Sequence, residues 1–225
     1  MLVLNALAWG VVASTGSGVR HDICYGIKEG SLPSVMAWLR LNGVASLRDW
    51  GGMTSAMMLP LAVAPARFVA FNSFWYRRYR AMACFTAGFL GVWLMAGSLG
   101  MVASLLLDLS DPRFRAAPAG MLILAMVWQL TPMKARALRR CHLTAVLAPA
   151  GWRADRSCLR FGLDHGIQCV SSCWTLMLIS VTTAHQPLIM AGLTVLMLAE
   201  RSQWLSDKRF LSGLPLLLMA WFARK

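Results

Sequence analysis

Long apolar segments alternate with short polar ones along most of this chain. Apolar runs cover residues 2–19, 50–70, 81–107, 116–130, 158–183, 187–199 and 210–222. A helix needs about 20 apolar residues to cross the hydrocarbon core of a bilayer, and several of these runs approach or exceed that length. The pattern therefore predicts an all-α fold, a polytopic transmembrane helical bundle of about six to seven spans.

The N-terminal part differs from the rest of the chain. Residues 2–19 are rich in small side chains and no Lys or Arg precedes them, which favours a weak first transmembrane helix over a cleaved signal peptide. Residues 20–48 are polar and mixed, and the piece 34–47 has the pattern of an interfacial amphipathic helix. We therefore expect one unit at residues 1–49, a weak helix with a periplasmic or interfacial segment, and a membrane bundle at residues 50–225.

Composition agrees with a membrane protein, because 58% of the residues are hydrophobic and only 14% are charged. The net charge of +13 is typical of nucleic-acid binders, but the Arg and Lys gather between apolar segments and form no stripe with interleaved aromatic residues. Such clusters set membrane topology. Residues 67–80 and 134–160 should therefore face the cytoplasm, with the bilayer as partner and no nucleic acid.

Soft donor side chains recur on the fifth predicted span. His165, Cys169, Cys173 and Met177 follow one another at every fourth residue, so they share one face of a helix. The chain has six Cys, and because several lie inside apolar segments we expect mostly free thiols.

A second pair of soft donors, Met53 and Met57, lies on the second predicted span. The second and fifth spans enter the membrane from opposite sides, which places this pair near the depth of Cys173 and Met177, toward the periplasmic surface. Thiolate and thioether ligands select Cu(I). The sequence thus predicts a Cu(I) site whose candidate ligands are Cys169, Cys173, Met57, Met53, Met177 and His165.

Packing explains the same residues in a second way, and both interpretations stay open. Met and Cys on membrane helices commonly fill gaps between neighbours, and His165 can serve as a polar residue bonded to a carbonyl. Cys141 and His142 follow a basic run and are interpreted as surface residues, and the basic run itself as a topology signal. Gly162 and Gly166 form a small-xxx-small pair, which we expect to pack against the fourth span.

No catalytic motif competes with these features. The chain has no Gly-x-Ser-x-Gly, no Walker lysine loop and no His-Glu-x-x-His, and no carboxylate pair lies inside a predicted span. We therefore expect no enzyme. The alternative to a metal-binding protein is a non-catalytic structural or assembly subunit of a larger membrane complex, and a small transporter is disfavoured because no inverted repeat is visible.

Four segments carry a resemblance to a known family, in the same order along residues 50–201. They are WGGMTSAMMLP (50–60), WQLTPMKARALRRCH (128–142), FGLDHGIQCVSSCWTLM (161–177) and AGLTVLMLAER (191–201). In these the chain resembles the predicted metal-binding integral membrane protein family, a bacterial family of unknown function described as copper-chaperone-like.

The resemblance implies a multi-pass protein of the bacterial inner membrane that handles Cu(I) or delivers it to a membrane or periplasmic protein. It also implies a metal-binding-type bundle over residues 50–225. Family members usually carry a further Cys where this chain has Ser172, which leaves two thiols in the motif. The positions carried over are Trp50, Met53, Met57, Met58, Pro60, residues 130–134, Cys141, Gly166, Cys169, Cys173 and Trp174.

Overall fold

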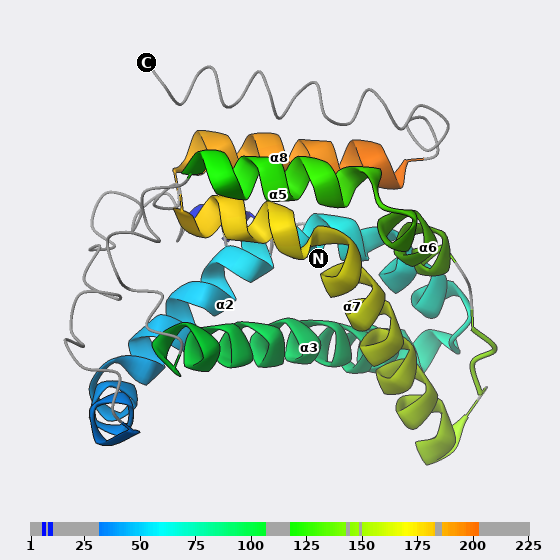
Figure 1. The fold of residues 1–225 in the computed structure, drawn as a ribbon. Helices are drawn as coiled ribbons and strands as arrows, with labels where there is room; N and C mark the ends of the chain where they lie inside the picture. The colour runs from blue at the N-terminus through cyan, green and yellow to red at the C-terminus, as the bar shows by residue number, and fades with distance from the viewer. Residues whose placement is uncertain are drawn as a thin grey trace.

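The structure is a computed structural model that describes residues 6–7, 9–10, 32–106, 118–142, 145–148, 150–182 and 186–202. Across these ranges the regular structure is helical and contains no strand, which confirms the all-α prediction for this part of the chain (Figure 1). The elements are α2 (Leu32–Phe71), η2 (Trp75–Arg77), α3 (Arg78–Leu106), α5 (Pro118–Leu130), α6 (Pro132–Cys141), α7 (Gly151–Thr182) and α8 (Pro187–Arg201).

Two segments of the described residues, Gly43–Phe71 and Trp75–Ala103, are long and apolar enough to cross a membrane by length and composition. The count of six to seven spans stays a prediction. Residues 210–222 and most of residues 2–19, which were expected to form the last and first spans, lie outside the described residues.

Four helices lie where the hydrophobic pattern predicted spans. α3, α5 and α8 agree with the predicted 81–107, 116–130 and 187–199 to within three residues at each end. α7 begins at Gly151, seven residues before the apolar run, because its polar first turns continue the helix outside the apolar part. Pro187 stands in the first turn of α8, where its missing N–H costs no helical hydrogen bond.

α2 differs from the prediction. The sequence suggested a separate helix at 34–47 followed by a span from residue 50, but the structure has one helix of 40 residues that also runs through Pro60 and Pro65. Packing across residue 50 explains the continuity. The Trp50 indole covers Gly97 of α3, and its Nε1 donates a hydrogen bond of 2.9 Å to the Trp93 carbonyl. The division of the chain at residue 49 stays a prediction.

α3 and α7 pack closely through glycines. A Cβ placed on Gly88 would lie 2.6 Å from the carbonyl oxygen of Leu159, and one on Gly162 would clash with the backbone of Phe85. Gly166 faces Val92 and the Phe89 carbonyl in the same way. The prediction that Gly162 and Gly166 pack against the fourth span was therefore wrong about the partner, because Gly88 gives α3 a complementary small position.

α6 is an amphipathic helix where the sequence was interpreted as a basic loop. The side chain of Thr131 caps it by accepting a hydrogen bond from the backbone N–H of Lys134. Arg136, Arg139 and Arg140 are exposed on one face, and the opposite face is buried against the bundle.

The two basic segments meet at one end of the molecule. Asp155 of α7 accepts from Arg77 at 2.5 Å and from Arg80 at 2.7 Å, and Arg77 also donates to the Gly151 carbonyl. This contact agrees with the prediction that residues 67–80 and 134–160 share a side, while the side of the membrane stays a prediction.

Candidate metal centre

The two thiols of α7 lie in the core of the bundle. Cys169 and Cys173 are 1% and 3% exposed and lie one helical turn apart on the same face of α7. The Sγ of Cys169 lies 3.9 Å from the Sδ of Met58 on α2. Three sulfur atoms from two helices are thus brought together in an apolar, almost water-free environment.

The predicted methionines surround this group without all touching it. Met53, Met57 and Met177 are buried in the same hydrophobic cluster, and the Met57 Sδ accepts a hydrogen bond of 3.6 Å from the Ser180 hydroxyl. The methionine that lies near the Cys169 thiol is Met58, the residue next to Met57, which the spacing of four had selected. A search for donors at every fourth residue misses it, because adjacent helical residues point about 100° apart.

His165 lies apart from the thiols. Its ring packs among Phe85, Phe89 and Phe161, each with its centroid 5.9 Å away, and its Nε2 contacts the guanidinium of Arg201. Arg201 has no acceptor site, so the imidazole must offer its unprotonated nitrogen. His165 would therefore have to give up Arg201 before this nitrogen could bind a metal.

Cys141 is buried, which corrects its interpretation as a surface residue. It is 7% exposed at the C-terminal end of α6, near Ser172 and Cys173 of α7. Burial raises the pKa of Cys141 to about 11, so the thiol is protonated at neutral pH. Burial and the Arg201 cation lower the pKa of the neighbouring His142, which keeps that imidazole neutral.

A buried ion pair lies close to the thiols. Lys134 Nζ is 2.7 Å from Glu200 Oε2 with both side chains at most 5% exposed, and it also donates to Gln129 Oε1. Lys134, which the sequence groups with the basic run, is therefore buried and its charge is neutralised inside the bundle. These contacts link α5, α6 and α8 through Gln129, Lys134 and Glu200.

The donor set limits the metal. In the part of the chain that the structure describes, no three His, Cys, Asp or Glu side chains are arranged to hold an ion. Closed zinc sites take four such ligands. Two thiols with one thioether instead form the soft, sulfur-only set that selects Cu(I) over hard cations.

Comparison with known protein families gives a match over most of the chain. Residues 47–223 match the model of a family described as PpoB2, copper chaperone. The chain belongs to this family. The comparisons with curated proteins and with solved structures each returned no match.

Membership of the copper chaperone family confirms the resemblance found in the sequence. The match begins within α2 and covers every element that contributes to the thiol group. The spacing of donor residues did not identify Met58 as a neighbour of the thiols, nor Cys141 and Lys134 as buried residues. All three lie in the segments that carry the resemblance. Those segments were the signal available to find them.

Proposed function

We propose that this member of the copper chaperone family is a multi-pass inner-membrane protein that binds Cu(I) through Cys169 and Cys173 and passes it to a membrane or periplasmic protein. One observation carries the proposal: two buried thiols lie one helical turn apart on the same face of α7, and the Sγ of Cys169 lies 3.9 Å from the thioether sulfur of Met58. A thioether binds more weakly than a thiolate, so Met58 serves as an exchangeable third ligand.

The surroundings of the sulfurs favour a soft, singly charged ion. Mg²⁺ and Ca²⁺ need several oxygen ligands, and the thiol group is surrounded mainly by apolar core residues. Binding removes the protons of the thiols, so affinity should fall as the pH drops. Met57, Met53 and Met177 continue the sulfur lining away from the thiols and act as positions along which Cu(I) moves.

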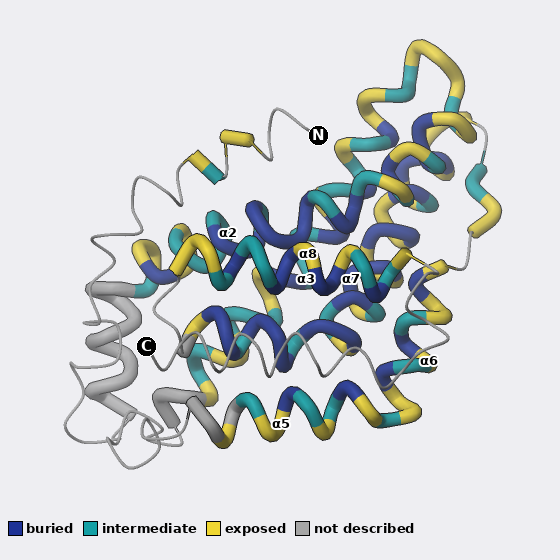
Figure 2. Tube along the Cα trace, turned by 90° about the horizontal axis from the view of Figure 1, so that it is seen from above, coloured by how far each residue is buried: buried dark blue, intermediate teal, exposed yellow. Residues whose placement is uncertain are grey.

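The outer surface supports a membrane location. Large apolar side chains on the outward faces of several helices are more than 35% exposed, as the exposed parts of the tube in Figure 2 illustrate. Water would make such a surface aggregate, whereas lipid is its natural solvent. The residues are Leu94, Met95 and Leu99 of α3, Ile123, Leu124, Val127 and Leu130 of α5, Leu159, Leu163 and Ile167 of α7, and Leu188, Val195 and Leu198 of α8.

The length of α7 fits the same proposal. Its 32 residues span about 48 Å, against about 30 Å for the hydrocarbon core. The excess corresponds to its first turns, where Arg153, Asp155 and Arg156 lie in a cytoplasmic position. We propose six to seven spans in total and no catalytic activity, because a chaperone binds and releases its cargo unchanged.

Copper retention tests the proposal. The full-length protein is loaded with Cu(I) under reducing conditions, desalted, and analysed for copper beside Cys169→Ser/Cys173→Ser. A matched control, Cys84→Ser/Cys158→Ser, removes two other thiols of the bundle. We expect about one copper per chain in the wild type and the control, and none in the first variant. Equal retention in all three, with equal elution on gel filtration, would favour the structural subunit instead.

A further inference from the structure

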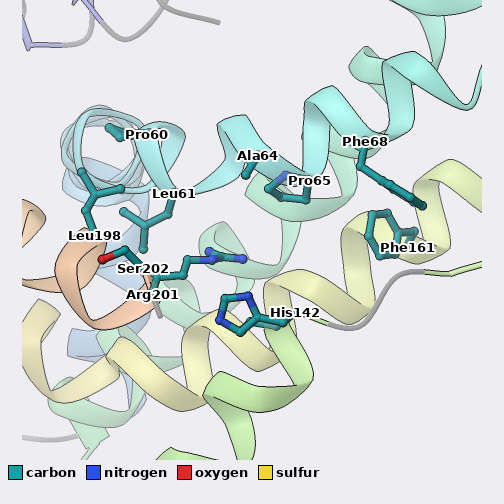
Figure 3. A pocket seen from close by; sticks show the side chains of 11 residues that line it. Pro60, Leu61, Ala64, Pro65, Phe68, His142, Phe161, Leu198, Arg201 and Ser202 are labelled. Carbon is teal, nitrogen blue, oxygen red and sulfur yellow. The ribbon is translucent and has the colours of Figure 1, made fainter. Parts of the chain in front are cut away.

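A partly open cavity of about 360 Å³, lined by Cys141 among others, lies between α2, α6, α7 and α8. Its apolar wall comes largely from α2, with Pro65 and Phe68, and the Phe161 ring of α7 packs against Phe68 (Figure 3). A volume of this size accommodates a small organic molecule rather than a bare ion. The cavity is therefore large enough to bind a small molecule that carries the ion.

The polar side chains of the cavity are of a particular kind. They include a thiol, an imidazole and a guanidinium, from Cys141, His142 and Arg201. In Figure 3 the Arg201 guanidinium lies between the α2 wall and His142. Among the residues that the structure describes, no carboxylate pairs with Arg201, whose recorded partner is the neutral ring of His165. The cavity thus offers a positive charge to a ligand that carries a carboxylate.

Cys141 connects the cavity to the metal centre. It lines the cavity, and its thiol lies near Ser172 and Cys173 of α7; the Ser172 hydroxyl is 3.4 Å from the Cys173 sulfur. A soft ion held at Cys141 is therefore close to the Cys169 and Cys173 pair. A purely packing role for Cys141 would not require it to lie near both the cavity and the thiol pair.

We propose that this cavity receives Cu(I) as its complex with a small thiol that bears a carboxylate, and that Cys141 is the first protein ligand. Arg201 binds the carboxylate of the incoming carrier, and the apolar wall of α2 holds its carbon chain. The inference rests on the proposed function, because the ion is handed on to Cys173 and Cys169.

The transfer is a ligand exchange without oxidation or reduction. The Cys141 sulfur forms a bond to Cu(I) while one bond between copper and a carrier sulfur breaks, and the proton of the Cys141 thiol goes to the departing carrier thiolate. A second exchange replaces the Cys141 sulfur by that of Cys173 and returns the proton to Cys141, and a third replaces the remaining carrier sulfur by that of Cys169, whose proton leaves with the second carrier thiol. Copper stays Cu(I) throughout, and each step releases one neutral thiol.

Loading rates test the inference on the full-length protein in detergent. Cu(I) is supplied either with 3-mercaptopropionate or with 2-mercaptoethanol, two carriers that differ in the carboxylate, and the copper bound to protein is followed with time. We expect the wild type to load about tenfold faster from 3-mercaptopropionate, the effect of one charge-assisted hydrogen bond. Equal rates from the two carriers would overturn the inference without any variant.

Variants assign the effect to residues. Arg201→Gln should bring the ratio of the two rates close to one, Arg201→Lys should keep most of it, and Arg139→Gln, at an exposed arginine of α6, should leave it unchanged. Cys141→Ser should slow loading from both carriers while the final copper content stays the same. A ratio unaffected by Arg201→Gln would overturn the inference, as would loading unaffected by Cys141→Ser.

Final copper content separates this inference from the proposed function. Normal retention at Cys169 and Cys173 with no effect of carrier would leave the proposed function intact and remove the cavity's role. Loss of retention in the wild type would remove both.

Discussion

Adding one methyl group at Gly88 should force α3 and α7 apart. The new Cβ would lie 2.6 Å from the Leu159 carbonyl oxygen and 3.1 Å from the Leu163 nitrogen, against 3.4 Å or more for ordinary contact. Both neighbours are backbone atoms, which cannot rotate out of the way. Relief therefore requires a shift of a whole helix, and overpacking of this kind costs about 1–3 kcal/mol.

Gly91→Ala is the matched control, because Gly91 lies on the same helix and a Cβ there meets nothing within 4 Å. Both substitutions gain the same helix propensity, about 1 kcal/mol in favour of Ala. The difference between the two variants therefore isolates the packing cost.

Thermal unfolding in detergent, followed by circular dichroism, measures that difference. At about 2–4 °C per kcal/mol for a chain of this size, Gly88→Ala should unfold several degrees below Gly91→Ala. Equal midpoints would refute the close α3–α7 contact.

The remaining predictions concern the charges and the third thiol. Lys134→Met leaves Glu200 buried without its partner and should lower the free energy of unfolding by about 3–5 kcal/mol. The control Arg136→Met, on the exposed face of α6, should lower it by less than about 0.5 kcal/mol. Equal unfolding midpoints for the two variants would contradict the buried pair. Because burial raises the pKa of Cys141 to about 11, its alkylation by iodoacetamide, read by peptide mass spectrometry, should still accelerate above about pH 10. A plateau by about pH 10, the behaviour of an ordinary thiol, would show that Cys141 is not buried. The Arg139→Cys variant should react with a membrane-impermeant maleimide added from the cytoplasmic side. Labelling from the periplasmic side would show that the topology is the reverse of the one proposed.

The hydrophobic pattern predicted the helices well, because apolar segment length decides where a helix lies in this kind of protein. α3, α5 and α8 therefore appear almost where they were expected. The pattern failed at residue 50, where the Trp50 contacts with Trp93 and Gly97 hold two predicted helices together as one. Contacts between distant residues leave no periodic trace in the sequence.

The same limit applies to the metal centre. Spacing by four placed Cys169 and Cys173 on one face of a helix, and the structure buries both thiols in the core of the bundle. The spacing gave no information on which methionine of α2 faces the thiols, because that choice depends on how α2 is rotated about its axis relative to α7. Lys134 and Cys141 looked like parts of a basic loop, since only the fold turns one face of α6 toward the core.

X-ray absorption at the copper edge tests the central claim most directly. Wild-type protein loaded with one equivalent of Cu(I) should give a first coordination shell made only of sulfur, from the two thiolates of Cys169 and Cys173 with or without the Met58 thioether. A shell that contains nitrogen or oxygen would contradict a site built from these sulfurs, as would an unchanged spectrum in Cys169→Ser/Cys173→Ser.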